Sequence, residues 1–356
     1  MAVMAPAPLQ ASQFEGNIDG KPVALYTLRN AQGMLCCITN YGAKILQLLV
    51  PNRDGRLGDV VLGYDSLAAV IDGSPSMGAF IGRYAGRLDG STFALDGVRH
   101  QLTANDGPHC LHGGIKGSRY RVFDAVQRDS ASVNMRYVFT DGEEGFPGEL
   151  ALDLTYTLAD TNELVLSYEA TALDKPTVAS FTSHAFFNLN GHASGSVMGH
   201  DIIVYADQFF TMRDDMVATG ELLAVGARPF YFRQPSAIDA HGLGGYDCCF
   251  LLRQSADKPL RLAAQVSAHA SGRRMQVWTT EPAMQLYTGQ VANQPLAGGL
   301  GKEGCRYLQQ QSLCLEPQGW PNAPNLMHLY PASSSAVHTP QHSRSGKTVY
   351  RFSIFR

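Results

Sequence analysis

The middle of the chain reads VFDAVQR (122–128), SVNMRYVFT (132–140), ELALDLTYTL (149–158) and ELVLSYEA (163–170), with turn-forming residues between these runs. Apolar and polar residues alternate within each run. A period of two predicts a β-strand with one face in the core and the other in solvent. Short turns between such strands predict an antiparallel meander. This stretch therefore predicts an all-β fold.

The chain on both sides of this meander shows the same kind of pattern. Further strands are predicted at 21–28, 34–39, 43–51, 59–62, 201–205, 249–252, 260–267, 274–279, 283–288 and 347–354, and one short helix is predicted at 66–71. The 36 glycines and 18 prolines favour many turns, and only 17 % of residues are charged. The composition shows no break typical of a linker, so residues 1–356 are predicted to form one domain, with 1–14 as a loose tail.

Charge and hydropathy exclude several classes of protein. A formal net charge of -3 gives no basic stripe for a nucleic acid, and no apolar run is long enough to cross a membrane. The N-terminal MAVMAPAPLQASQF lacks the basic and apolar regions of a secretory signal. The seven cysteines include two adjacent pairs and no C-x-x-C, which indicates reduced thiols in a cytoplasmic protein rather than a disulfide framework or a zinc ribbon.

One candidate catalytic group lies in SLCLEPQGWPNAPN (312–325). Residues 312–316 are predicted to form the end of a strand, which Pro317 ends because proline has no N–H for a ladder. Glu316 then lies at the strand end among apolar neighbours. Burial there raises the pKa of a carboxyl group toward the range of a general base. A structural glutamate that accepts backbone hydrogen bonds in a turn is the alternative.

Two arginines occur in MGAFIGRYAGRL (77–88). The glycines of this stretch do not form G-x-G-x-x-G, so close backbone packing is a better interpretation than a phosphate-binding loop. Arg83 and Arg87 need partners beside an apolar strand, either carboxylates or the hydroxyls of a ligand.

Histidines mark two further stretches. In LTANDGPHCLHGG (102–114), His109, Cys110 and His112 could suggest a metal site, but no second cluster matches them, and hydrogen bonding to a polar ligand is favoured. In TVASFTSHAFFNLN (177–190), His184 lies among phenylalanines that would lower its basicity, whereas a nearby carboxylate would raise it. A satisfied core histidine is the alternative for His184.

Six segments in order resemble the aldose 1-epimerase family, the galactose mutarotases: GRYAGR (82–87), LHGG (111–114), SHAFFNL (183–189), GGYD (244–247), QLYTG (285–289) and CLEPQ with PNAPN (314–325). The resemblance covers essentially the whole chain. It implies a β-supersandwich of large antiparallel sheets with a sugar site in a cleft across one sheet, and it implies no metal and no other cofactor.

The resemblance also implies a reaction and a set of roles. Free hexoses, galactose or glucose, would change between α and β anomers by ring opening and reclosure. Glu316 would take the proton from the C1 hydroxyl and His184 would protonate the ring oxygen. A histidine charged near neutral pH beside an ionised carboxylate is expected, because each favours the charged form of the other. Residues around the sugar hydroxyls would be Arg87, His112, Asp247 and Gln285, with Gly86 and Phe186 also at the substrate, whereas Arg83 is expected to lie away from it.

Four departures from the family pattern affect specificity. Gly86 stands where many members have Asn, Ser183 replaces a frequent Asn, Phe186 lacks the hydroxyl of a common Tyr, and Cys248-Cys249 replaces a usual His-Asn. The preferred hexose, and whether the protein is a monomer or a homodimer, stay open. Alternatives are a sugar-binding protein without turnover, a carbohydrate lyase or hydrolase, and a mutarotase for phosphorylated hexoses.

Overall fold

The four alternating runs form consecutive strands β12 (Asp124–Gln127), β13 (Ser132–Phe139), β14 (Leu150–Ala159) and β15 (Glu163–Ala172). They belong to a computed structural model that describes residues 6–226, 229–254, 259–289, 295–296, 299–329 and 336–355. The alternation decides which face is buried: in β14 the side chains of Leu152 and Leu154 are fully buried, whereas Asp153 between them is exposed. The predicted meander is confirmed.

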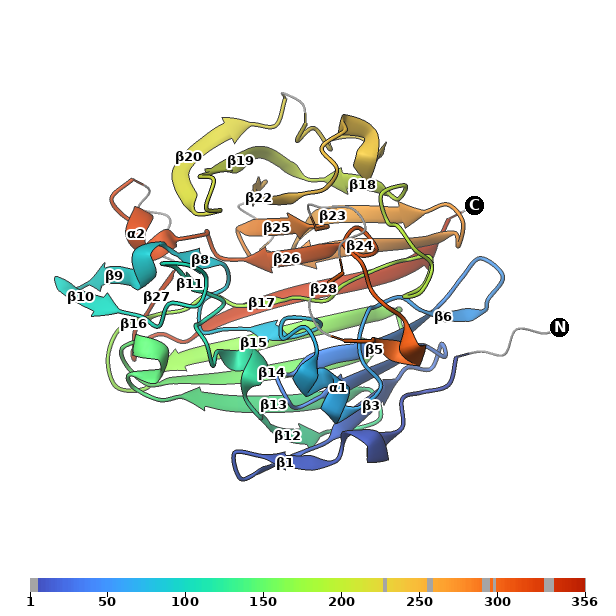
Figure 1. Ribbon diagram of the computed structural model, residues 1–356, viewed down its shortest axis with the longest axis horizontal. Coiled ribbons are helices and arrows are strands. Elements are labelled where there is room, and N and C mark those ends of the chain that lie inside the picture. Colours follow the sequence, from blue (N-terminus) through green and yellow to red (C-terminus); the bar gives the residue numbers. More distant parts are fainter. Residues whose placement is uncertain are drawn as a thin grey trace.

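These strands form one half of a nine-stranded antiparallel sheet with the order β12-β13-β14-β15-β28-β24-β23-β18-β21. The other strands of this sheet are β28 (Arg344–Ile354), β24 (Arg273–Thr279), β23 (Arg261–Ala268), β18 (Asp201–Val204) and β21 (Ser236–Ala237). The last strand of the chain thus lies in the centre of the sheet, between β15 and β24 (Figure 1).

Two smaller antiparallel sheets pack with the large one (Figure 1). The five-stranded sheet has the order β20 (Ala218–Ala224), β19 (Ala206–Met212), β22 (Asp247–Leu252), β25 (Ala283–Tyr287) and β26 (Cys314–Gln318). The four-stranded sheet contains β3 (Leu25–Arg29), β4 (Leu35–Thr39), β5 (Lys44–Pro51) and β6 (Leu57–Asp59). A single apolar cluster contains Ile45, Leu152 and Leu315, one from each sheet. The predicted all-β supersandwich is confirmed.

Short pairs of strands connect the large sheets. They are β1 (Gly16–Ile18) with β2 (Lys21–Val23), β7 (Phe80–Ile81) with β17 (Thr182–Ser183), β8 (Arg87–Leu88) with β11 (Cys110–Leu111), β9 (Thr92–Leu95) with β10 (Val98–Gln101), and β16 (Thr177–Val178) with β27 (Val337–His338). The described 3₁₀ helices are η1 (Ala11–Phe14), η2 (Asp89–Ser91), η3 (Ser118–Tyr120), η4 (Glu143–Gly145), η5 (Ile238–His241) and η6 (Lys302–Gly304).

The described α-helices are α1 (Leu67–Asp72) and α2 (Ala323–Leu326). The predicted helix at 66–71 corresponds to α1, where the Ser66 hydroxyl caps the N-terminus by accepting from the N–H of Ala69. Neither helix has the length and hydropathy that crossing a membrane requires, among the residues described.

The prediction that Pro317 ends its strand is wrong. β26 continues through Pro317, which lies opposite Met284 of β25. Leu313 exchanges both backbone hydrogen bonds with Phe187, on the side of the strand away from β25. Because strand residues alternate, Pro317 has the same orientation, and its missing N–H removes no bond from the ladder with β25.

The expected loose tail falls partly outside the described residues, but its later part is packed. Phe14 is fully buried. The N–H of Leu9 donates to Oε1 of Gln47 at 3.0 Å, and Nε2 of Gln47 donates to the carbonyl of Ala7 at 3.1 Å. Residues 7–14 are therefore anchored to the four-stranded sheet through β5.

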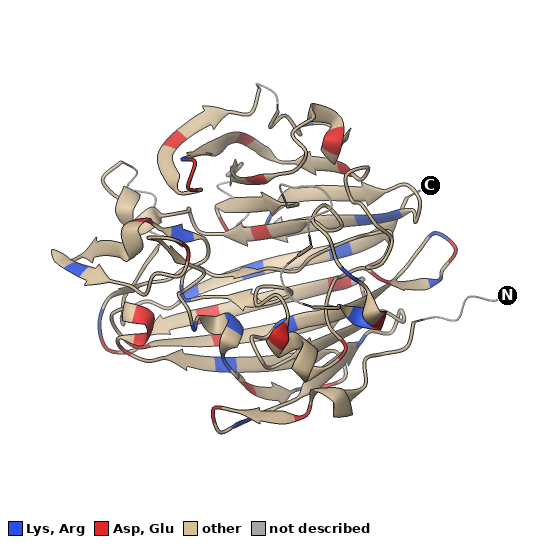
Figure 2. Ribbon diagram, viewed as in Figure 1, with Lys and Arg blue, Asp and Glu red and all other residues tan. Residues whose placement is uncertain are grey.

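Charged residues of both signs are intermixed along the described ribbon (Figure 2). Lys302 and Asp59 form a buried ion pair: Lys302 is 2 % exposed and Asp59 is 5 % exposed, and their side chains are in direct contact. Nζ of Lys302 also donates to the carbonyls of Leu46 and Val61 at 2.7 and 2.8 Å. Such complete satisfaction offsets the cost of removing an ammonium group from water.

Candidate active site

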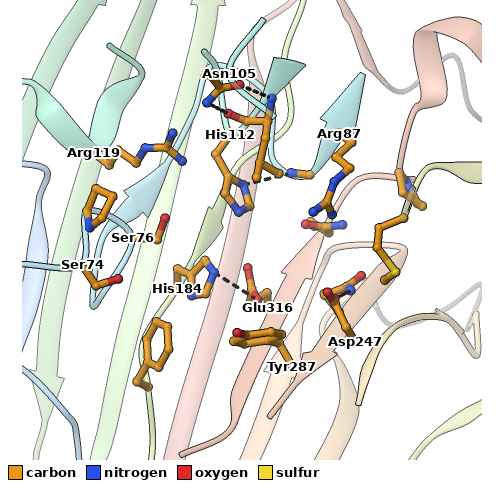
Figure 3. Close-up of a pocket in the computed structure, with 18 of the residues that line it drawn as sticks. Ser74, Ser76, Arg87, Asn105, His112, Arg119, His184, Asp247, Tyr287 and Glu316 are labelled. Atoms are coloured by element: carbon orange, nitrogen blue, oxygen red, sulfur yellow. Dashed lines mark hydrogen bonds and ion pairs between the residues drawn. The ribbon is translucent and has the colours of Figure 1, made fainter. Parts of the chain in front are cut away.

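The site residues predicted from the sequence line one cleft of about 520 Å³ (Figure 3): Gly86, Arg87, His112, His184, Phe186, Asp247, Gln285 and Glu316. The volume is that of a typical small-molecule pocket. The residues come from β8, β22, β25 and β26, from the position directly before β8, and from the segments that follow β11 and β17. The structure therefore brings the whole predicted set together, while the role of each residue stays a prediction.

Strand alternation aims three of these side chains into the cleft. Glu316 in β26 lies opposite Gln285 in β25, and Leu315 beside Glu316 belongs to the apolar core. Asp247 in β22 lies opposite Tyr287 in β25. Because Tyr287 follows Gln285 by two residues, these side chains lie on the same face of the sheet. Glu316, Gln285, Asp247 and Tyr287 thus form a polar array on one face of the five-stranded sheet.

The same alternation places the adjacent cysteines Cys248 and Cys249. Cys248 points to the core face, where it packs in the cluster that contains Leu286. Cys249 lies opposite Gln285, on the cleft side of the sheet, but it has no exposed surface. Neither thiol lines the cleft.

The two candidate acid/base groups face each other. Nε2 of His184 lies 3.6 Å from Oε1 of Glu316, and the two residues are 7 % and 2 % exposed. Burial lowers the pKa of His184 to about 4. Burial raises the pKa of Glu316 well above its ordinary value, and the charge of Asp247 raises it further. Desolvation therefore outweighs mutual attraction in the free cleft.

These pKa shifts correct one expectation. A charged histidine near neutral pH beside an ionised carboxylate was expected, but burial in the free cleft lowers the pKa of His184 and raises that of Glu316, so it disfavours the charged form of both groups. With one proton between them, the two groups form either a neutral pair or an ion pair, and these two forms differ only in the position of that proton.

Aromatic rings form the wall around His184. The ring of Phe186 stacks on the imidazole at 4.9 Å with an angle of 12°, and the ring of Tyr287 meets it edge-on at 6.3 Å. Burial raises the pKa of Tyr287 to about 12, so its hydroxyl stays a hydrogen-bond donor. The N–H of His184 donates to the carbonyl of Ala79 at 2.8 Å, which fixes the backbone of the histidine against the segment before β7.

His112 has a defined tautomer. Its Nδ1 accepts from the N–H of Gly86 at 3.2 Å, so the ring proton lies on Nε2. Burial lowers the pKa of His112 well below its usual value, and the imidazole is neutral. His112 can therefore donate a hydrogen bond to a ligand in the cleft.

The glycine after His112 is required by close packing. Gly113 has a φ of +80°, and a Cβ there would lie 2.3 Å from the carbonyl oxygen of Gly82. No larger residue fits this approach without movement of the backbone. The LHGG segment thus folds tightly enough to hold His112 beside Gly86.

Arg87 and Asp247 lie near each other in the cleft (Figure 3), and each is paired with a further side chain. Oδ1 of Asp247 accepts from Nε2 of Gln285. Nε of Arg87 donates to Oδ2 of Asp106 at 2.6 Å. Burial raises the pKa of Asp247, while the charge of Arg87 opposes this rise. Paired side chains with free donors and acceptors suit the hydroxyls of a sugar.

The position of Gly86 leaves space in the cleft. This residue has a φ of +80°, and the nearest heavy atom to an added Cβ would be Nε2 of Gln318 at 3.9 Å. Among the described residues, no atom would therefore lie in close contact with a Cβ at this position.

Sequence reasoning missed several residues of the cleft. Tyr287 and Gln318 follow Gln285 and Glu316 by two residues, so strand alternation could have identified them. Ser74 and Ser76 come from the loop before β7, and Arg119 comes from the 3₁₀ helix η3; none of the three had such a signal.

Asn105 and Arg119 support the two histidines. Nδ2 of Asn105 donates to the carbonyls of Leu111 and Gly114 at 2.9 and 3.0 Å, which holds the loop around His112. The positive charge of Arg119 lowers the pKa of both His112 and His184. Arg119 therefore adds to the effect of burial.

The other candidates considered from the sequence lie away from the cleft lining. Arg83 is buried and donates to the carbonyl of Pro147 at 3.0 Å and to the hydroxyl of Thr177. Nε2 of His109 lies 3.2 Å from Oδ2 of Asp215. Because Cys110 packs in an apolar cluster and His112 faces the cleft, the three residues 109, 110 and 112 do not converge on one point.

Comparison with known proteins shows the family to which the chain is related. The sequence profile of the aldose 1-epimerase family matches residues 24–351. A galactose mutarotase from Bos taurus is 37 % identical over 325 residues, which cover 89 % of this chain and 90 % of the relative. An aldose 1-epimerase from Escherichia coli K12 is 33 % identical over 316 residues, with 86 % and 89 % covered.

Solved structures give the same result. The crystal structure of an aldose epimerase homologue from C. elegans superposes with a TM-score of 0.85 at 28 % identity and covers 94 % of this chain and 100 % of its own. The family match, the identities and the superposition each extend over most of the sequence. The chain belongs to the aldose 1-epimerase family.

Proposed function

We propose that the protein is an aldose 1-epimerase that interconverts the α and β anomers of free hexoses, galactose or glucose, with Glu316 as general base and His184 as general acid. The observation that supports this assignment is the 3.6 Å separation of Nε2 of His184 and Oε1 of Glu316 inside a polar cleft. Mutarotation needs a base at O1 and an acid at O5, two oxygens bonded to the same carbon. Two catalytic atoms this close can each contact one of them.

The reaction follows from these two contacts. Glu316 removes the proton from the C1 hydroxyl while His184 donates a proton to O5, and the C1–O5 bond breaks to give the open-chain aldehyde. Rotation about C1–C2 exposes the other face of the carbonyl. O5 then attacks C1 while His184 takes its proton back and Glu316 returns a proton to O1. Each positioned group contributes about 10²–10⁴-fold.

In the neutral pair, a proton has to move from Glu316 to His184 before the reaction can begin. The active form has the proton on His184 and an ionised Glu316, whereas burial favours the neutral pair. Sugar hydroxyls that donate to the carboxylate favour its charged form, because hydrogen bonds to an ionised group lower its pKa. Substrate binding therefore favours the active distribution of the proton.

Substrate contacts are assigned to the remaining side chains. Arg87, Asp247 and Gln285 bind ring hydroxyls at one end, and His112 donates a hydrogen bond from Nε2. Phe186 stacks on His184 and presents an apolar edge. The open volume beside Gly86 accommodates variation in the sugar, so we assign the enzyme to hexoses as a class.

Other features support a cytoplasmic location and a single domain as the functional unit. All seven cysteines are free thiols, in keeping with a reducing, cytoplasmic compartment. Groups from β8 through β26 build one cleft, in keeping with one domain as the functional unit.

Polarimetry tests the proposal. Freshly dissolved α-D-galactose and α-D-glucose relax to their equilibrium rotation, and catalytic amounts of the protein should accelerate this first-order relaxation in proportion to enzyme concentration. A rate equal to the buffer blank for every aldose tested would exclude the proposed activity. Calorimetric binding of the same sugars without acceleration would instead indicate a sugar-binding protein.

A further inference from the structure

A third chemically reactive group lies beside the acid/base pair. Cys314, His184 and Glu316 each offer one ligand atom, and these atoms all lie within 4.8 Å of one another. Within the described ranges, no other set of three His, Cys, Asp or Glu side chains has this arrangement. The proposed mechanism uses His184 and Glu316 but gives no task to the thiol.

The backbone holds the three side chains in place. Cys314 and Glu316 are two residues apart in β26, so both project from the same face of the strand. The pairing of Cys314 with Tyr287 and of Glu316 with Gln285 fixes β26 against β25. His184 is anchored separately through the β7 segment. The cluster is therefore preformed, and only side-chain rotation is needed to bring its atoms closer.

The donor set is one that zinc prefers. Thiolate, imidazole and carboxylate are all common Zn²⁺ ligands, with bonds of about 2.0–2.3 Å in tetrahedral sites. Two ligands of such a site lie about 3.3–3.6 Å apart. Nε2 of His184 and Oε1 of Glu316 are already 3.6 Å apart. The thiol lies within 4.8 Å of the ligand atoms of both other residues, so a small side-chain movement would complete the set.

The surroundings leave one coordination position open. His184 and Glu316 line the cleft, whereas Cys314 has no exposed surface and lies behind them. A metal ion bound to the three would have protein on one side and the cleft on the other. Three protein ligands with a fourth position for water or a sugar oxygen describe an accessible zinc site.

We propose that Cys314, His184 and Glu316 form an inhibitory site for Zn²⁺ and similar thiophilic divalent cations. Binding replaces the thiol proton and the proton shared by His184 and Glu316, and both leave to solvent. The metal then occupies the lone pairs that the base and the acid need, so neither can transfer a proton to the sugar. The inhibition rests on the proposed function, whereas the binding itself does not.

Cobalt gives a readout that does not depend on activity. Co²⁺ bound to a thiolate shows a sulfur-to-metal charge-transfer absorption in the near ultraviolet, and a tetrahedral site adds strong visible bands. The test uses the full-length Cys305→Ser protein, because Cys305 is the only cysteine that is not buried. In this background Co²⁺ should give a saturable charge-transfer band at one ion per chain, which Zn²⁺ abolishes.

Two variants locate the site. Cys314→Ser should lose the band and weaken Zn²⁺ inhibition of mutarotation at least about 100-fold, since loss of an outer-shell partner alone already costs 10–100-fold in metal affinity. Cys249→Ser is the matched control, because Cys249 is also buried beside Glu316 but lies outside the cluster. It should keep both the band and the inhibition. Cys314→Ala repeats the test if the serine hydroxyl perturbs folding, which circular dichroism reports.

The outcomes separate the two proposals. A band that survives in the folded Cys314→Ser or Cys314→Ala variant, or no band in the parent protein at a large excess of Co²⁺, overturns the metal site. A Cys314-dependent band in a protein without mutarotase activity leaves the metal site standing and rejects the proposed function. Zn²⁺ inhibition that persists unchanged in the folded Cys314→Ser variant would place the inhibitory ion elsewhere.

Discussion

The substitution Glu316→Gln tests the proposed base most directly. The amide has the shape of the carboxyl group and still forms hydrogen bonds, but it cannot take up a proton from O1. A positioned base contributes about 10²–10⁴-fold, or about 2.7–5.4 kcal/mol of transition-state stabilisation. Glu316 is only 2 % exposed, and the other carboxylate of the cleft, Asp247, is hydrogen-bonded to Gln285. Among the described residues that line the cleft, Asp247 is the one other carboxylate and it is already engaged, so a loss toward the upper end of that range is expected.

Although Glu316→Gln should lower activity, it should not lower the free energy of unfolding. Burial raises the pKa of Glu316 above its ordinary value of 4.5, so the folded state binds the proton more tightly than the unfolded state. Wild-type stability therefore falls as pH rises from about 4.5 through the raised pKa. Glutamine does not titrate. Thermal unfolding should show a variant at least as stable as wild type, with a difference that grows with pH over this window.

Glu281→Gln is the matched control. Glu281 is a carboxylate whose pKa burial also raises, and its Oε1 accepts from the hydroxyl of Tyr168 at 2.7 Å. It lies outside the cleft lining, so its amide variant should keep wild-type mutarotation. Polarimetric rates of purified variants decide the matter. If Glu316→Gln retains a rate within tenfold of wild type while its fold is intact, Glu316 is not the base.

Four further predictions concern the same cleft and its support. His184→Asn should lower kcat by about 10²–10⁴-fold with the circular dichroism spectrum unchanged, and near-normal turnover would remove His184 from the mechanism. The wild-type rate, corrected for buffer catalysis, should fall toward pH 4, where the His184–Glu316 pair gains a second proton, and again at alkaline pH, where the pair loses the proton that it needs. A rate that stays constant toward pH 4 would contradict this assignment. Asp247→Asn should raise KM by about 10–100-fold through weaker hydroxyl contacts, and an unchanged KM would argue that Asp247 does not bind the sugar. Asp59→Asn leaves the ammonium of Lys302 buried without its carboxylate and should destabilise the protein by about 3–5 kcal/mol in denaturant titrations, whereas a loss below 1 kcal/mol would show that its backbone acceptors suffice.

The parts of the fold that follow local rules could be predicted from the sequence. In β14 a period of two places Leu152 in the core and Asp153 in solvent, and the observed burial follows it residue by residue. β26 could not be treated in this way, because both of its faces are buried and it contains Pro317. Whether this strand continues through Pro317 depends on which of its edges pairs with β25, and tertiary contacts decide that pairing.

The site shows the same division. Alternation within β25 and β26 is enough to place Gln285 with Tyr287, and Glu316 with Gln318, on shared faces. The meeting of His184 with Glu316 depends on the bridge between Phe187 and Leu313, two segments distant in the chain, and here only the family resemblance gave guidance. Nothing in the sequence of the loop before β7 or of the 3₁₀ helix η3 indicates that Ser76 and Arg119 reach the cleft.

Protonation was the property that local reasoning predicted least well. A histidine facing a carboxylate suggests an ion pair, but that inference assumes that attraction outweighs the loss of water. At 7 % and 2 % exposure the loss of water decides, and it lowers the pKa of His184 while it raises that of Glu316. Burial thus disfavours the charged form of both groups while the cleft holds no sugar. We propose that hydrogen bonds from a bound sugar favour the ionised carboxylate, so that the substrate helps to generate the active base.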